Sequence, residues 1–248
     1  MDNSSYISIS RQSGLLKEMN VIANNIANAS TTGFRRESAI FSEFVVQAGA
    51  DNPAAHSNRM KSSVAIGRLG AHYSDFTSGS LSRTGGALDL AIEGDGFFLI
   101  GTPDGEHLSR AGRFMTNQDG ALVTPDGHFV LDEAGSSIQI PPDAGLISIG
   151  GDGTISAGGA PLGKIGLVNA DQATLTRIGG NLWQAKDGFT PVENPTIVQG
   201  YLEDSNVNPV LEMARMIEVQ RAYEAGQKLL EIVDERVAKT ISAMRQPP

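Results

Sequence analysis

The sequence predicts an α+β protein in which long helices from the two chain ends pair in a coiled-coil-like manner around an inserted all-β domain of short antiparallel strands. Apolar residues recur at helical spacing near each end of the chain, and 23 of the 29 glycines lie between residues 76 and 200. In that glycine-rich part, short apolar runs alternate with turn dipeptides. We therefore expect a discontinuous helical domain (1–36 and 201–248), a connecting segment (37–75) and a β domain (76–200).

The first expected element is a helix over residues 5–29, with an apolar stripe at spacings of three and four. The stripe consists of Ile9, Leu16, Met19, Ala23 and Ile26, and Gln12 interrupts it. Asn24, Asn25 and Asn28 fall on the opposite side of this helix. Because Asn is a mediocre helix former, the three indicate either hydrogen bonding to another polypeptide or a fraying helix end, with Gly33 as its C-cap.

The connecting segment gives a weaker pattern. The apolar run at residues 40–46 either extends the helix or begins a strand. Residues 47–60 are rich in Ala, Asn, Gly and Pro, which is typical of a loop. Residues 62–75 have room for one or two strands.

The β domain is predicted from its apolar runs and its turns. The expected strands are Leu88–Ile92, Phe97–Ile100, Leu122–Thr124, His128–Leu131, Ile138–Ile140, Leu146–Ile149, Lys164–Val168 and Leu182–Gln184. Asp-Gly is the favoured dipeptide of tight hairpin turns, and six such pairs occur. They begin at Asp95, Asp104, Asp119, Asp126, Asp152 and Asp187.

The last expected element is a helix that starts at Asn208 and Pro209. Asn caps free N–H groups, and Pro is tolerated at the first helical position. A helix from Pro209 to Met244 would be roughly 54 Å long, which is too long to be hidden within a domain of this size. Its heptad seam consists of Met216, Val219, Tyr223, Leu230, Val233, Val237 and Met244. Such a seam favours a partner helix, although one amphipathic helix on a globular core would show a similar pattern.

The charge distribution excludes some classes of partner. The net charge is −9, and residues 76–200 carry six basic and fourteen acidic side chains. Nucleic acid requires a concentrated basic face, so neither nucleic acid nor an anionic membrane is expected as a partner. No apolar run approaches about 18 residues, so no membrane insertion is expected. The first residues lack the basic start and apolar centre of a secretory signal peptide.

The residues with catalytic or ligating chemistry form no site. The chain has no cysteine, and its four histidines are scattered without metal-ligand spacing. The Asp-Gly pairs lack the spacing of a calcium loop. We therefore expect no enzyme, no metal and no cofactor. Two alternatives are a β protein that binds or cleaves cell-wall glycan through carboxylates such as Asp132 and Glu133, and an adhesin-like calcium-binding β protein.

Four stretches in order resemble the signature blocks of the bacterial flagellar rod and hook proteins. They are VIANNIANASTTGFRR (Val21–Arg36), LDLAIEGDGFFLI (Leu88–Ile100), SRAGRFMTNQDGALVTPDGHFVL (Ser109–Leu131) and GYLEDSNVNPVLEMARMIEVQRAYEAGQKLL (Gly200–Leu230). Together they cover about half of the chain. Within the family that the chain resembles, a length of 248 residues favours the rod proteins with a β insertion over the shorter rod proteins and the longer hook protein. The start resembles the proximal rod type more than the distal type, while the last block is also close to the distal type.

The resemblance implies a structural subunit of the flagellar basal-body rod, the axial drive shaft that spans the periplasm and transmits torque. Its implied partners are other proximal and distal rod subunits, further copies of itself and the flagellar type III export apparatus, which needs no cleaved signal. The positions that match the family signatures are Asn24, Asn25, Asn28, Thr32, Gly33, Phe34, Ser205, Asn206, Val207, Asn208, Glu212, Met213, Gln220, Arg221 and Tyr223. These residues are expected to form subunit contacts, to hold the chain's own two helices together, or both.

Overall fold

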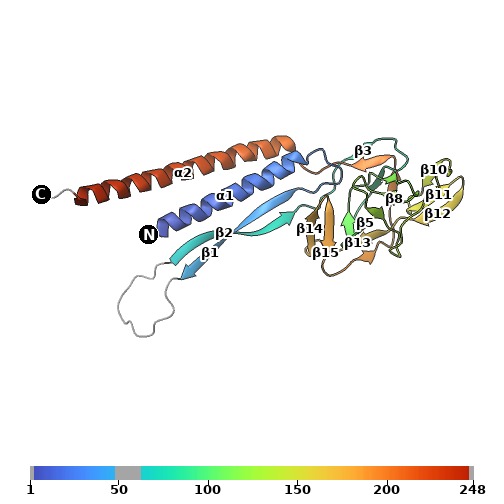
Figure 1. Cartoon of the computed structure of the whole chain (residues 1–248), viewed down its shortest axis with the longest axis horizontal. Helices are drawn as coiled ribbons and strands as arrows, with labels where there is room; N and C mark the ends of the chain where they lie inside the picture. The colour runs from blue at the N-terminus through green and yellow to red at the C-terminus, as the bar shows by residue number, and fades with distance from the viewer. Residues whose placement is uncertain (1–2, 48–62, 246–248) are drawn as a thin grey trace, which may run out of the picture. The chain divides into compact units, whose positions relative to one another are not determined.

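The computed structural model describes residues 3–47 and 63–245, which divide into two compact units (Figure 1). The first unit is made of Met1–Ala27, Glu37–Asp75 and Asn208–Pro248. The second, called the β unit below, is made of Asn28–Arg36 and Phe76–Val207. Residues 37–75, which were expected to connect the two domains, thus belong to the same unit as the helices. Residues 28–36, which were expected in the helical domain, belong to the β unit.

The first unit contains two helices and two strands among its described residues. They are α1 (Asn3–Ala27), β1 (Glu37–Gln47), β2 (Ser63–Ser74) and α2 (Pro209–Arg245). β1 and β2 pair antiparallel, with a register shift between Ile40 and Phe41. The α+β class is therefore confirmed, and residues 40–46 lie in a strand. The loop expected over residues 47–60 lies outside the described residues except for Gln47.

The α2 helix begins as the sequence predicts. The Asn208 side-chain oxygen Oδ1 accepts hydrogen bonds from the backbone N–H groups of Val210 and Leu211, at 3.1 and 3.2 Å. Pro209 takes the first helical position, where its missing N–H has no cost. Glu212 adds a carboxylate to the first turn, where its negative charge interacts favourably with the positive end of the helix dipole.

The α1 helix buries a different face from the one predicted. Ile9 and Leu16 of the expected stripe are 58 % and 43 % exposed. Val21 and Ile22 are buried instead, together with Gln12 and Asn25. The expected stripe was wrong because α1 carries apolar side chains on more than one face. Their spacing alone does not indicate which of these faces is buried. Val21 and Ile22, which are adjacent and β-branched, lie on the face that packs.

The β unit is built of sixteen short strands. They are β3 (Leu81–Arg83), β4 (Leu90–Ile92), β5 (Phe97–Thr102), β6 (Gly105–Ser109), β7 (Met115–Thr116), β8 (Leu122–Val123), β9 (Phe129–Val130), β10 (Ile147–Ile149), β11 (Thr154–Ala157), β12 (Ala160–Lys164), β13 (Leu167–Asn169), β14 (Leu175–Gly179), β15 (Leu182–Ala185), β16 (Thr190–Pro191), β17 (Ile197–Gln199) and β18 (Tyr201–Glu203).

Nine of these strands form one antiparallel sheet, in the order β14-β15-β6-β5-β9-β8-β7, with β13 joining β5 to β16. β10, β11 and β12 form a three-stranded sheet, while β17 pairs with β4 and β18 with β3. The run expected at Ile138–Ile140 forms only an isolated bridge between Gln139 and Ala121, although Ile138 and Ile140 are buried. The central strand β5 is buried on both faces. Phe98 and Ile100 enter one apolar core, and Phe97 and Leu99 enter a second core around Trp183.

Four of the six Asp-Gly pairs lie in hairpin turns, as predicted, and two do not. Their six glycines all have positive φ, from 78° at Gly120 to 125° at Gly96. Four of the pairs connect strands that are hydrogen-bonded to each other, namely β5 to β6, β7 to β8, β8 to β9 and β10 to β11. The pairs at Asp95 and Asp187 connect strands that have different partners.

Candidate functional site

Asn25 is the centre of a buried polar contact between α1, the start of β1 and α2. Its amide nitrogen Nδ2 donates to the carbonyl of Glu37 at 2.8 Å and to Oε2 of Glu212 at 3.1 Å. Its Oδ1 accepts from the backbone N–H of Glu37 at 3.0 Å. Asn25 is 1 % exposed and Glu212 is 2 % exposed. These two family-signature residues therefore hold elements of one chain together.

Two further polar contacts join the helices, which run antiparallel (Figure 1). Arg215 Nη2 lies 3.0 Å from Oε1 of Glu18. Closer to the N-terminus of α1, Gln12 Nε2 donates to the backbone carbonyl of Tyr223 at 2.9 Å. The helix pair is thus held at its end by Asn25 and farther along by Glu18 and Gln12.

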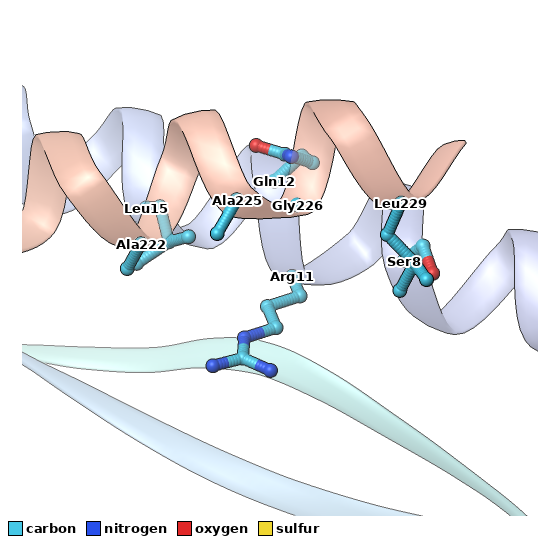
Figure 2. A pocket seen from close by; sticks show the side chains of 8 residues that line it. All are labelled: Ser8, Arg11, Gln12, Leu15, Ala222, Ala225, Gly226 and Leu229. Carbon is cyan, nitrogen blue, oxygen red and sulfur yellow. The ribbon is translucent and has the colours of Figure 1, made fainter. Parts of the chain in front are cut away.

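Beside Gln12 the two helices leave an open groove of about 490 Å³, shown in Figure 2. We call it the helix groove, and its lining residues are Ser8, Arg11, Gln12, Leu15, Ala222, Ala225, Gly226 and Leu229. The Gln12 side chain lies against Gly226, where a Cβ atom would come within 2.3 Å of Nε2. Gly226 therefore gives Gln12 the space it needs to reach α2.

Replacing Gly226 with Ala is expected to change stability by less than about 1 kcal/mol. Alanine favours the helix, but its methyl group displaces the Gln12 amide and removes the hydrogen bond to Tyr223. In a Gln12→Ala background only the helix-propensity gain remains, so the same Gly226→Ala change should stabilise by about 1 kcal/mol. Thermal unfolding followed by helical circular dichroism checks the difference. Equal effects in both backgrounds would mean that Gln12 does not depend on the space above Gly226.

Away from α1, α2 exposes large apolar side chains. Val210 and Leu211 are 69 % and 66 % exposed, and Met213 and Ile217 are about half exposed. Gln220 and Arg221 are exposed as well. The predicted site residues of α2 thus divide between a buried Glu212, a half-buried Tyr223 and an outward set formed by Met213, Gln220 and Arg221.

In the β unit, the segment after α1 is held by a buried cluster of three charges. Glu203 lies between two guanidinium groups, 2.7 Å from Arg35 and 2.9 Å from Arg110. All three side chains are at most 3 % exposed. Burial lowers the pKa of Arg110, and the carboxylate of Glu203 opposes that shift. An arginine remains charged even so, which makes Glu203 the counter-charge for both cations.

The same segment is packed closely against the β unit by its backbone and aromatic ring. Gly33 has a φ of 68°, and a Cβ there would lie 2.5 Å from the backbone nitrogen of Ala111, so no other residue fits. The guanidinium of Arg177 lies 4.3 Å from the ring centre of Phe34 and 4.6 Å from that of Trp183. A cation over two aromatic faces is a favourable arrangement.

The remaining signature residues of the β unit hold its two end segments together. Asn206 Oδ1 accepts from the backbone N–H of Arg36 at 2.7 Å, and its Nδ2 donates to the carbonyl of Thr77 at 3.0 Å. The carbonyl of Thr32 accepts from Asn181 Nδ2 at 2.9 Å. Val207 is buried, and its N–H donates to Ser205 Oγ at 3.2 Å.

At the end of α1, Asn28 Oδ1 accepts from Thr31 Oγ1 at 3.2 Å, in the turn where the chain leaves the helix. Asn24, one turn earlier, is exposed. The three Asn residues expected on one outward face thus have different environments.

Sequence reasoning missed several residues that these contacts depend on. They are Gln12, Arg35, Arg110, Arg177, Asn181 and Glu203. Gln12 gave a signal, since it is a polar residue within an apolar repeat. Arg35, Arg110 and Glu203 lie within the blocks that resemble the family, but nothing marked them as buried, because isolated charges in a sequence are normally exposed.

The described residues include no group of three side chains that could hold a metal ion. Within the same residues, neither helix has an apolar stretch of the length that crosses a membrane.

Three protein-family profiles match the chain, in the order in which their segments occur. Residues 6–35 match the profile described as "Flagella basal body rod protein". Residues 91–157 match "Flagellar hook protein FlgE/F/G D1 domain". Residues 198–243 match "Flagellar basal body rod FlgEFG protein C-terminal". The profiles thus cover α1 with the segment after it, much of the β unit, and α2.

Relatives match nearly the whole chain. A flagellar basal-body rod protein FlgF from Caulobacter vibrioides is 41 % identical over 93 % of both chains. A second FlgF, from Mesorhizobium japonicum, is 38 % identical over 93 % of this chain and 92 % of its own. A flagellar basal-body rod protein FlgG from Bacillus subtilis is 36 % identical over 99 % of this chain and all of its own. The chain therefore belongs to the flagellar basal-body rod protein family.

Proposed function

We propose that the chain is a proximal rod subunit that polymerises through its terminal helices into the axial drive shaft of the flagellar basal body. The relatives named above are structural rod proteins, and FlgF proteins are among them. FlgG proteins also match over most of the chain, so a distal rod subunit is the second candidate. Under either assignment the protein would lie in the periplasm-spanning rod, reached through the flagellar type III export apparatus.

The exposed apolar face of α2 is the observation that carries the assembly proposal. Val210, Leu211, Met213 and Ile217 are each at least 49 % exposed and lie within eight consecutive residues. Contiguous exposed apolar side chains are typical of an interaction surface. Neighbouring subunits that cover this face would place the helices along the rod and let torque pass through them. A supercoiled, coiled-coil-like geometry of the helix pair is part of this proposal.

An Ile217→Glu variant is expected to fold normally and to be lost from the rod. Ile217 is 51 % exposed, so the charge costs little in the free chain. At a packed interface the same charge would be buried without a partner, which costs several kcal/mol. Immunoblots of purified basal bodies and swimming assays in cells that lack the wild-type chain check the result.

Ile178→Glu is the matched control, because Ile178 of β14 is 47 % exposed but lies in the β unit. It should enter the basal body at the wild-type level. Normal incorporation and swimming of the Ile217→Glu strain would contradict the proposal. The same assay tests Gln220→Ala and Tyr223→Ala, for which we expect weaker incorporation.

A further inference from the structure

One acceptor in the helix groove has no donor. Gln12 is 9 % exposed, and its side-chain nitrogen Nε2 donates a hydrogen bond to the Tyr223 carbonyl. Its oxygen Oε1 is buried and has no hydrogen-bond partner among the described residues. A buried acceptor without a donor costs about 1–3 kcal/mol, so the Gln12 amide would recover that energy by turning toward an occupant of the groove that supplies a donor.

The rest of the helix groove defines the occupant further. Ala222, Ala225 and Gly226 form a floor of small residues on α2, which lets another helix approach closely. Leu15 and Leu229 add apolar surface, and Leu229 is 53 % exposed. Arg11 extends away from both helices toward the strand β2 (Figure 2) and makes no ion pair within the described part of the chain. The groove thus suits a helix that presents an apolar side chain, a donor and an acid.

The chain carries a helix face with those three groups. On α2 an outer stripe recurs at spacings of three and four, and its members are Val210, Met213, Ile217, Gln220 and Glu224. All five are exposed. Gln220 donates only to Glu224 on the same surface, at 3.3 Å, so its amide is accessible for a better acceptor.

We propose that the helix groove of one copy receives the outer stripe of α2 from a second copy of this chain. Ile217 covers the small-residue floor, the Gln220 amide donates to Gln12 Oε1, and the Glu224 carboxylate pairs with Arg11. The lengths agree, because Ile217 to Glu224 and Ser8 to Leu15 each comprise eight residues, roughly 10 Å of helix. This inference rests on the proposed function and names the partner surface within it.

The arrangement also explains how the contact could repeat. At 3.6 residues per turn, the outer stripe and the α2 residues of the groove lie about 150° apart around the helix. One copy can therefore use both surfaces at the same time, each with a different neighbour. Such a heterologous contact forms an open array when its rotation does not close.

Disulfide trapping tests the contact directly, because the natural chain has no cysteine. Two copies with different tags are expressed together, one with Ala225→Cys in the groove and the other with Ile217→Cys in the stripe. A disulfide requires Cα atoms within about 7 Å, so oxidation of purified basal bodies should give a heterodimer only if the two sites meet. Each copy has a single cysteine, so no bond within one chain can form.

Two control pairs keep one of these cysteines. Ile178→Cys with Ala225→Cys should give no heterodimer. Ser13→Cys, on the exposed side of α1, with Ile217→Cys should give none either. If the Ser13 pair is trapped and the Ala225 pair is not, the stripe binds elsewhere and the inference is overturned.

The proposed hydrogen bond between Gln220 of one copy and Gln12 of the other can be tested separately. Gln220→Met should lower the yield of the trapped heterodimer about tenfold, because the contact then no longer supplies a donor to Gln12 Oε1. In a Gln12→Met background the same change should have no such effect, because both side chains are then apolar. Equal losses in the two backgrounds would overturn the proposed Gln12–Gln220 contact.

Failure of this inference differs from failure of the proposed function. Cysteine copies that enter the basal body but are not trapped overturn the groove assignment and leave rod assembly standing. A tagged wild-type chain that is absent from the basal body overturns the proposed function itself. If only the cysteine copies fail to enter, trapping in a concentrated solution of the purified chains makes the same comparison, and absence of the heterodimer there also overturns the inference.

Discussion

Glu203→Gln is expected to destabilise the β unit by about 3–5 kcal/mol, because it removes one member of a buried ion cluster. Arg35 and Arg110 both contact the Glu203 carboxylate and are at most 3 % exposed. After the change two guanidinium groups remain buried without a counter-charge. The new amide NH2 group is a donor, so it also opposes whichever arginine it faces.

Urea unfolding followed by the fluorescence of Trp183 measures this loss. Trp183 is the single tryptophan of the chain, and it is 1 % exposed in the second core of the β unit. The matched control is Glu193→Gln, which makes the same change at an exposed position of the β unit. We expect that control to lie within about 0.5 kcal/mol of the natural chain. A similarly small effect of Glu203→Gln would mean that the cluster contributes little.

The Glu203 cluster is a part of the fold that could not be predicted from the sequence. The helices, the Asn208 cap and the Asp-Gly turns follow from patterns within a few residues, and the structure confirms the helices, the cap and four of the six hairpin turns. The Glu203 cluster combines residues from three distant parts of the chain, and Arg110 and Glu203 are 93 positions apart. No local pattern marks it, because only the complete fold removes these charges from water.

The sequence indicated which residues of the helices to consider, but it did not indicate which of their side chains face the partner helix and which face outward. The family signatures pointed to Asn25, Glu212 and Gln220, yet the structure buries the first two and exposes the third. The orientation of Asn25 followed from the stripe assigned to α1, which was wrong. When a helix has apolar residues on several faces, its packing partners determine which face is buried. The helix α1 packs against both α2 and the strands β1 and β2. That the outward residues bind other subunits stays a prediction.

Asn25→Leu is expected to destabilise the helix and hairpin unit by about 2–4 kcal/mol, because it removes three hydrogen bonds of one buried side chain. The backbone N–H and carbonyl of Glu37 would lose their partner, and the Glu212 carboxylate would lose a donor. Leucine has the branched shape of asparagine but is larger, so the change leaves no cavity, and the loss combines the removed polar contacts with some overpacking.

Helical circular dichroism during thermal unfolding measures the effect on α1 and α2, while Trp183 fluorescence reports the β unit separately. Asn20→Leu is the control, since it makes the same change at an exposed position of α1. The comparison separates two roles for Asn25. If it holds one chain together, Asn25→Leu lowers the unfolding temperature of the purified chain and Asn20→Leu does not. If its main role is between copies, both purified variants unfold together and only incorporation into the basal body is lost, which would contradict the geometry described above.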